Sequence, residues 1–218
     1  AQIAKEAGIP DGVFNVLPGF GDVGEALGRH NDVDAVSFTG STEVGGYFLK
    51  YSGESNLKTV GLEMGGKSPF IVLGDAKITD DLINNAIDSA FWNGGQNCSA
   101  NMRQIIHSNV KEEFLDKVLK KVKTIQVGDP LNPETNMGSM ISKQHLATVD
   151  GFIQKGIDEG ATLLYGGVSE KDQNGFFAKP TLFDNLTEDM TIARDEIFGP
   201  VLGVLTVNNT EEALKIAK

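Results

Sequence analysis

The sequence predicts an α/β protein, and three patterns support this class. Apolar runs with the length of single strands recur along the 218 residues, and longer runs between them have apolar residues every three or four positions. Two successive strand–glycine–helix units lie within residues 13–51, which is typical of a doubly wound nucleotide-binding sheet. Hydrophobic residues make up 40% of the chain and charged residues 22%, as in globular proteins.

Strands are expected where short apolar runs are bounded by glycine, proline or polar residues. These runs are residues 13–17, 35–38, 58–63, 70–73, 104–106, 162–165 and 201–207. Helices are expected over the periodic segments between them, which are residues 1–7, 24–29, 42–51, 78–91, 114–125, 142–160 and 210–216. Ser41 or Thr42, Thr79 or Asp80, and Ser142 are suited to cap three helices, because their side-chain oxygens accept from free backbone N–H groups.

Composition argues against several classes of protein and site. The net charge is −11 without a basic run, so no binding to nucleic acid is expected. No apolar run approaches the roughly 18 residues of a membrane span, so no membrane association is expected. One cysteine excludes an internal disulfide, three scattered histidines with it do not form a zinc site, and the first residues lack a signal-peptide pattern. A cytoplasmic protein without a metal is therefore expected.

The one cysteine, Cys98, lies in a polar, glycine-containing segment, residues 93–103. A thiolate is a strong nucleophile, so a lone cysteine in this setting is a candidate catalytic residue. Gly94 and Gly95 allow backbone angles that would turn the chain sharply and present the thiol at the end of a helix. The alternative is a small buried core residue, the commoner role of a free cysteine. His107 ends the next expected strand, too far along extended backbone for direct contact, and is interpreted as structural.

Two glycine-containing turns that follow expected strands are suited to bind an anion. Gly19, Gly21 and Gly24 form a literal G-x-G-x-x-G, which either places a pyrophosphate at a helix N-terminus or simply connects a strand to a helix. In the second turn, Ser41 or Thr42 would cap the next helix and could donate to an anion.

Two expectations concern the segments after the second turn. Val44, Phe48 and Tyr51 recur at helical spacing and are expected to face the core. Glu63 ends the following strand beside two glycines, and open α/β sheets bind ligands at such carboxyl ends of strands. A solvent-exposed loop glutamate is the alternative interpretation.

Four segments share a recognisable composition, order and spacing. They are residues 38–45 (FTGSTEVG), 62–69 (LEMGGKSP), 95–98 (GQNC) and 196–200 (EIFGP). Together they resemble the signature blocks of the NAD(P)-dependent aldehyde dehydrogenase superfamily, and the similarity extends over essentially all 218 residues. The resemblance implies part of a Rossmann-type cofactor domain over residues 1–64, followed by an α/β catalytic domain over residues 65–218, truncated at both ends.

The resemblance implies oxidation of an aldehyde to an acid, with Cys98 forming a hemithioacetal and then a thioester. Glu63 would act as general base for hydrolysis, and the backbone N–H of Cys98 would supply half of an oxyanion hole. Gly40 and Ser41 would lie at the cofactor pyrophosphate, with Val44 against the adenine.

The remaining cofactor contacts also follow from the resemblance. Gly19 and Gly21 would lie near the adenine, which replaces the pyrophosphate interpretation of their loop. Met64 would act through its backbone, Glu196 would hold the nicotinamide ribose, and Phe198 would position the nicotinamide ring. NAD is the expected cofactor, with NADP as the alternative.

Members of the family are more than twice this long, and both ends of the chain fall inside helical patterns. The resemblance implies that the missing segments carry the second oxyanion donor, a cofactor-binding lysine and a strand used in oligomer formation. The isolated chain is therefore expected to have little or no dehydrogenase activity and to expose apolar surface, whereas the parent is expected to be a homodimer or homotetramer. Two alternatives are a thiol hydrolase or acyl transferase built on Cys98 and Glu63, and a non-catalytic structural domain.

Overall fold

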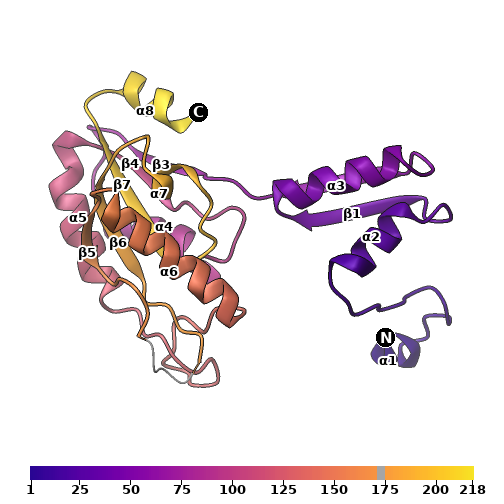
Figure 1. Cartoon of the computed structure of the whole chain (residues 1–218). Helices are drawn as coiled ribbons and strands as arrows, with labels where there is room; N and C mark the ends of the chain where they lie inside the picture. Colours follow the sequence, from indigo (N-terminus) through magenta and orange to yellow (C-terminus); the bar gives the residue numbers. More distant parts are fainter. Residues whose placement is uncertain (171–174) are drawn as a thin grey trace. The chain divides into compact units, whose positions relative to one another are not determined.

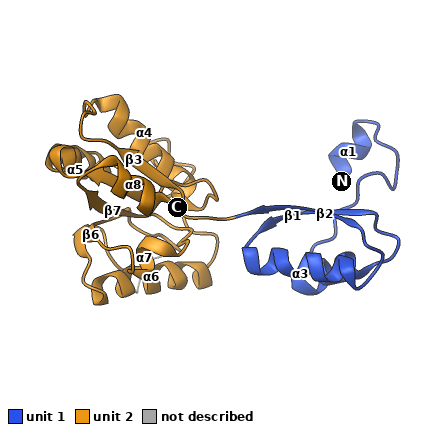
Figure 2. Cartoon of the chain, turned by 90° about the horizontal axis from the view of Figure 1, so that it is seen from above, with its two compact units in different colours: residues 1–64 blue, residues 65–218 orange. Residues whose placement is uncertain are grey.

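The chain folds into two compact units, Ala1–Met64 (unit 1) and Gly65–Lys218 (unit 2), shown in Figure 2. The structure is a computed structural model that describes residues 1–170 and 175–218. Mixed helices and strands in both units confirm the predicted α/β class. The boundary between the units lies directly after Met64, so the LEMGGKSP segment, residues 62–69, contributes residues to both units.

Unit 1 contains a parallel pair of strands and three helices, drawn in indigo to violet in Figure 1. In chain order they are α1 (Gln2–Glu6), α2 (Gly21–Arg29), β1 (Ala35–Gly40), α3 (Thr42–Gly53) and β2 (Thr59–Met64). The Ser41 hydroxyl accepts from the backbone N–H of Val44 at 3.3 Å, which caps α3 as the sequence predicts. Buried Lys58 donates to the carbonyl of Gly28 at 2.6 Å, so β2 is joined to the end of α2.

Two predictions for unit 1 are wrong. Residues 13–17 form turns and irregular backbone instead of a strand, and their apolar side chains are exposed. A strand needs a neighbour for its backbone hydrogen bonds, and within unit 1 only β1 and β2 pair. Val44 does not face the core, because its side chain is 37% exposed, whereas Phe48 on the same helix is buried.

Unit 2 is built on a five-stranded sheet with the order β3-β4-β7-β6-β5. The strands are β3 (Pro69–Val72), β4 (Arg103–His107), β5 (Thr162–Tyr165), β6 (Thr181–Leu186) and β7 (Val201–Val207). The first four in this order run parallel, and β5 pairs antiparallel with β6 at the edge. Strand β6 was not predicted, because Asp184 and Asn185 interrupt its apolar sequence.

Helices cover both faces of this sheet (Figure 1). They are α4 (Asp80–Phe91), the short 3₁₀ helix η1 (Trp92–Gly95), α5 (Ser108–Val122), α6 (Lys143–Asp158), α7 (Thr191–Arg194) and α8 (Thr210–Ala217). Successive residues of β7 separate the two faces, since Leu202 packs with α4 and α5 and Val201 packs with α6 and α7. Such burial on both faces explains the nearly continuous apolar sequence of β7.

The caps of α4 and α6 agree with the sequence, whereas α5 begins at Ser108, six residues before the expected start at residue 114. Thr79 caps α4 by accepting from Leu82 N, and Ser142 caps α6 by accepting from His145 N. His107 Nδ1 accepts from the backbone N–H of Asn109 at 3.1 Å, which gives this histidine a structural place at the start of α5. Among the described residues, no helix combines the length and apolarity needed to cross a bilayer.

Candidate active site

The Cys98 loop begins with a sharp reversal of the chain after α4. Asn93, Gly94 and Gly95 have φ angles of 53°, 63° and 70°, in the left-handed region that glycine adopts without strain. Asn93 Nδ2 donates to the carbonyl of Gln96 at 3.1 Å, and Gln96 Nε2 donates to the carbonyl of Asn93 at 3.2 Å. The two amide side chains therefore fix the turn that precedes the thiol.

Cys98 is exposed, so the interpretation as a buried core residue is wrong. Asn97 Oδ1 accepts from the backbone N–H and the hydroxyl of Ser99, at 3.3 and 3.2 Å. The Cys98 thiol lies 3.9 Å from the same oxygen. Asn101 Nδ2 donates to the carbonyl of Pro69 at 3.2 Å, which ties the end of this loop to the start of β3. An accessible thiol on a tethered loop is what a nucleophile requires.

A contact between two glycines joins the Cys98 loop to the 196–200 segment. A Cβ on Gly95 would lie 2.4 Å from the carbonyl oxygen of Gly199, and a Cβ on Gly199 would lie 2.4 Å from Cγ2 of Val149. Neither position can hold a larger residue without displacement of backbone or of α6. The structure thus brings together the Cys98 loop, the segment that carries Phe198, and α6.

Phe198 has an uncommon backbone conformation that a histidine supports. Its φ is 55°, and its side chain is 37% exposed. His145 Nε2 lies 2.6 Å from the Phe198 carbonyl oxygen, so the ring donates this hydrogen bond. The two rings also meet edge to face, with centroids 6.1 Å apart. His145 therefore holds the loop in the geometry that presents the Phe198 ring.

Glu196 lies against the glycine turn that opens unit 2. A Cβ on Gly65 would lie 1.9 Å from Glu196 Oε2, so the carboxylate occupies the space that glycine leaves. Glu196 Oε1 is buried without a hydrogen-bond partner among the described residues. An unpaired buried carboxylate oxygen is costly and is suited to accept from ligand hydroxyls.

The cofactor candidates of unit 1 gather where β1 and β2 end and α3 begins. Gly40 ends β1, Ser41 caps α3, and the Met64 sulfur lies 2.7 Å from the Cβ position of Gly45 on that helix. Glu63 is exposed on β2, opposite Thr39 of β1. Open α/β sheets bind their ligands at this edge.

The other glycine turn of unit 1 lies at the start of α2. Gly19 precedes the helix, Gly21 is its first residue, and both are exposed. Phe20 between them occupies the cap position without a side-chain hydrogen bond to the helix. The first-turn N–H groups of α2 therefore receive no hydrogen bond from a capping side chain.

The predicted site residues are divided between the two units. Cys98, Glu196 and Phe198 belong to unit 2, whereas Glu63 and the remaining cofactor candidates belong to unit 1. The joint action of Glu63 and Cys98 stays a prediction. Within the described part of the chain, no cluster of three or more His, Cys, Asp and Glu side chains is placed to hold a metal ion.

Sequence reasoning missed His145 and the role of Asn97. His145 comes from the first turn of α6, 53 residues before Phe198, so the contact depends on how α6 packs. Asn97 has a local signal, because an asparagine directly before a cysteine can accept from the next backbone N–H.

Comparison with known proteins gives one consistent family. The model of the aldehyde dehydrogenase family matches residues 1–218. An aminoacetaldehyde dehydrogenase from Pseudomonas aeruginosa is 43% identical over 218 residues, and a betaine aldehyde dehydrogenase from Brucella anthropi is 44% identical over 217. The alignments cover 100% and 98% of this chain but 43% and 44% of the relatives, so the chain spans less than half of their length.

Solved structures agree with these sequence matches. The aldehyde dehydrogenase KauB from Pseudomonas aeruginosa has a TM-score of 0.95 and 45% identity, with coverage of 99% of this chain and 44% of that one. The NAD+ complex of an aldehyde dehydrogenase from Bacillus cereus has a TM-score of 0.94 and 43% identity, with the same coverage. By sequence and by fold, this chain belongs to the aldehyde dehydrogenase family.

Proposed function

We propose that the chain carries the thiol and part of the cofactor-binding machinery of an NAD-dependent aldehyde dehydrogenase. One observation carries the proposal: the lone cysteine of a family member is exposed on a loop that Gly95 holds against the segment bearing Phe198. Unit 1 acts as part of the cofactor domain and unit 2 as the catalytic domain. The parent of such a chain is a homodimer or homotetramer.

Cys98 is the nucleophile in this proposal. Its thiolate attacks the aldehyde carbon and forms a hemithioacetal, and loss of hydride from that carbon leaves a thioester on the same sulfur. The backbone N–H of Cys98 stabilises the oxygen that becomes negative during the attack. Asn97 supports the reaction by ordering the loop through its hydrogen bonds to Ser99.

Glu63 completes the cycle as a general base. It takes a proton from water as the water attacks the thioester carbon, which releases the carboxylic acid and restores the Cys98 thiol. An exposed carboxylate near the end of a strand is accessible to water and offers two oxygens that can accept that proton.

The residues present fit an NAD molecule. The buried, unpaired Glu196 Oε1 is an acceptor suited to ribose hydroxyls, and Phe198 offers an exposed aromatic face for the nicotinamide. Gly40 and the N-terminus of α3 suit the pyrophosphate, and exposed Val44 suits the adenine. Bound NAD would accept the hydride. The NAD+ complex among the solved relatives supports this choice.

The 218 residues alone are proposed to turn over aldehyde far more slowly than a full-length relative. The support is the coverage of less than half of each relative's length. Loss of one oxyanion donor typically lowers turnover by about a hundred- to a thousand-fold. An aldehyde-dependent rate of NADH formation comparable to that of a full-length relative would contradict this part of the proposal.

Alkylation of Cys98 with iodoacetamide, with and without NAD, tests the site directly. Because the chain has one cysteine, the labelling rate reports this thiol alone. We expect labelling faster than that of free cysteine, and a change of rate on addition of NAD. Glu196→Gln keeps the side-chain shape but removes the charge, so the effect of NAD should need higher NAD concentrations.

Two results would count against the proposal. Slow labelling that NAD does not alter would mean that these residues form no assembled site in the chain. Hydrolysis of a simple ester that requires Cys98 but ignores both NAD and Phe198→Ala would favour the thiol hydrolase instead.

A further inference from the structure

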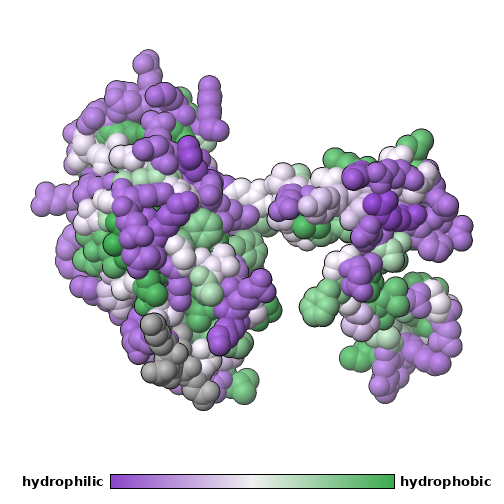
Figure 3. All heavy atoms as spheres, in the orientation of Figure 1, coloured by the Kyte–Doolittle hydropathy of each residue, from purple (hydrophilic) through white to green (hydrophobic). Residues whose placement is uncertain are grey.

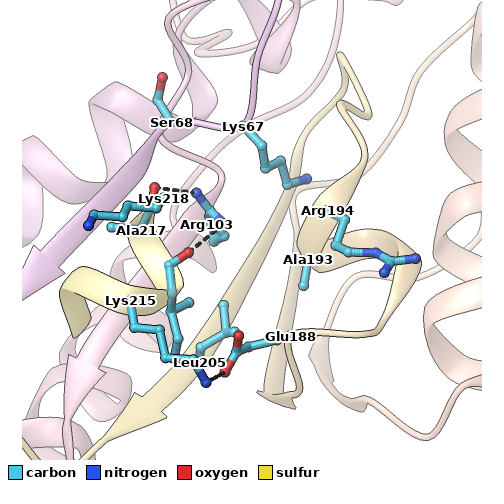
Figure 4. A pocket seen from close by; sticks show the side chains of 11 residues that line it. Lys67, Ser68, Arg103, Glu188, Ala193, Arg194, Leu205, Lys215, Ala217 and Lys218 are labelled. Carbon is cyan, nitrogen blue, oxygen red and sulfur yellow. Dashed lines mark hydrogen bonds and ion pairs between the residues drawn. The ribbon is translucent and has the colours of Figure 1, made fainter. Parts of the chain in front are cut away.

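A strongly cationic pocket lies in unit 2, bordered by the turn before β3, by α7 and by α8 (Figure 4). Its volume is about 550 Å³. Its charged lining among the described residues consists of Lys67, Arg103, Arg194, Lys215, Lys218 and Glu188. Apolar side chains such as Leu205 and Ala193 complete the walls. The lining cations thus outnumber Glu188, the one carboxylate side chain in the lining, although the net charge of the whole chain is −11.

That carboxylate already has a cationic neighbour. Glu188 Oε1 lies 3.9 Å from Lys215 Nζ, and both side chains are largely exposed. The opposite charges of Glu188 and Lys215 therefore roughly cancel each other within the lining. The remaining cations therefore give the pocket its positive potential.

Lys67 reaches into the pocket, and no described residue forms an ion pair with its ammonium group (Figure 4). Its Nζ is buried and has no hydrogen-bond partner among the described residues. Burial, and secondly the charge of Arg103, lower the pKa of Lys67 to about 8. Asp195 and Glu196 act in the opposite direction, but more weakly.

Arg103 faces the same pocket from β4, and only part of its hydrogen-bonding capacity is used. Its two terminal nitrogens donate to the carbonyls of Ile216 and Ala217, at 3.0 and 3.2 Å. Its Nε is buried without a partner among the described residues. Burial also lowers the pKa of Arg103. The pocket thus holds two cations that each have a buried nitrogen without an acceptor among the described residues, a costly arrangement that a bound anion would relieve.

We propose that this pocket binds a tetrahedral dianion, a sulfate or phosphate group, through Lys67, Arg103 and Arg194. The volume leaves space beyond the group itself, so a phosphate monoester with a small organic part also fits. The proposal does not depend on the proposed dehydrogenase function, because it involves no reaction step and neither Cys98 nor Glu63.

The site has a built-in pH dependence. A bound dianion stabilises the charged form of Lys67, so binding takes up a proton where free Lys67 is partly neutral. Arg103, Asp195 and Glu196 are the charged groups that act on this ammonium, and Arg103 stays charged throughout the range. If the charged form alone binds, the affinity falls by about tenfold between pH 7 and pH 9.

Isothermal titration of the 218-residue chain with sodium sulfate, at constant ionic strength, tests the proposal. Sulfate keeps its charge over this pH range, so any pH dependence belongs to the protein. We expect saturable binding at one site and the tenfold weakening from pH 7 to pH 9. Lys67→Met should weaken binding by about tenfold or more and abolish the pH dependence.

Two further variants make the test specific. Lys120→Met removes an exposed lysine that pairs with Asp116 on α5, far along the chain from the pocket lining, and should leave binding unchanged. Arg194→Gln changes an exposed side chain and should weaken binding without loss of the fold, which circular dichroism verifies. Tighter binding of glycerol phosphate than of sulfate would support a phosphate monoester as the ligand, and equal binding would support the free anion.

The proposal is overturned if the folded chain shows no saturable sulfate binding. It is also overturned if Lys67→Met binds sulfate as well as the unchanged chain, or if the affinity is the same at pH 7 and pH 9.

Discussion

The two units have the same kinds of local structure but differ greatly in how much apolar surface they bury. Within residues 1–64, all of which the structure describes, Phe48 is the one apolar side chain that is buried beyond nine-tenths. Unit 2 buries apolar side chains on both faces of its sheet, including the fully buried Phe114 and Phe183. Exposed hydrophobic residues around α1 and the segment before α2 are visible in Figure 3. The expectation of exposed apolar surface is confirmed.

The comparison shows that caps and strand pairing do not by themselves make a core. Both units have serine-capped helices and parallel strands, so their local hydrogen bonding is alike. A two-stranded parallel sheet offers too little area to bury two faces, whereas five strands with helices on each side bury both. Most of the free energy of folding should therefore reside in unit 2, and unit 1 should open at a lower cost.

The largest expected effect comes from deleting an aromatic ring in each unit. Phe114→Ala removes a fully buried ring and should lower the free energy of unfolding of unit 2 by about 3–5 kcal/mol. Phe48→Ala removes the ring that contacts Phe38 and Tyr51, and should loosen unit 1 alone. Urea unfolding followed by Trp92 fluorescence reports unit 2, and hydrogen exchange read by mass spectrometry reports unit 1. The comparison fails if Phe48→Ala shifts the urea transition as far as Phe114→Ala does.

Lys67→Met should stabilise unit 2 at pH 7 by about 1–3 kcal/mol, because a buried, unpaired ammonium is replaced by an apolar side chain. The folded-state pKa of Lys67 is about 8, below its ordinary value of 10.5. The unfolded chain therefore binds more protons between these values, and the stability of the unchanged protein rises with pH there. The advantage of the variant should shrink as the pH approaches 10.5.

Urea unfolding at several pH values between 7 and 10, with Lys120→Met as the control, measures this difference. Lys120 is an exposed lysine paired with Asp116, so its replacement should change stability by less than about 1 kcal/mol at each pH. A Lys67→Met chain that is less stable than the unchanged protein at pH 7 would show that the ammonium has a stabilising partner.

Matched cap deletions sharpen the comparison further. Ser41→Ala and Ser142→Ala each remove a hydroxyl that accepts from the third helical N–H, and each should cost about 1 kcal/mol. For Ser142 the cost should appear in the urea transition, because α6 packs on the sheet of unit 2. For Ser41 it should appear as faster hydrogen exchange in α3 with an unchanged urea transition. Equal shifts of the urea transition would show that the two units unfold together.

The smallest change in stability is expected on the exposed surface. Phe20 is 93% exposed, so Phe20→Ser should change stability by less than about 0.5 kcal/mol. It lies among other exposed apolar residues of unit 1, so the variant should bind less anilinonaphthalene sulfonate. Leu131→Ser in unit 2, also at an exposed site, serves as the control and should leave dye fluorescence unchanged. If Leu131→Ser lowers dye fluorescence more than Phe20→Ser does, the dye binds mainly to unit 2.

The sequence predicts features that local chemistry determines. Ser142 caps its helix as predicted, and Ser41 and Thr79 are the caps among the two candidates named for each of their helices. The glycines before Cys98 turn the chain as their type requires. Prediction from the sequence fails where secondary structure depends on pairing with a distant segment of the chain. Residues 13–17 were predicted as a strand but have no partner, whereas β6 was not predicted and is paired on both sides.

The same distinction holds within the candidate site. Cys98 and Glu196 are identifiable from short motifs, but the hydrogen bond from His145 to Phe198 and the unpaired state of Lys67 depend on packing between distant segments. A single sequence has no signal for either.

The order of strands in unit 2 has a consequence for how the protein folds during synthesis. Strand β7 lies at the centre of the sheet, between β4 and β6, yet it is the last of the five strands to leave the ribosome. One edge of β4 pairs with β7, and almost a hundred residues separate the two strands along the chain. This edge stays open until residues 201–207 have been synthesised. Such long-range parallel pairing is slow to form. The nascent chain therefore passes through a long stage in which one edge of an apolar strand is unpaired, when chaperone binding would matter most.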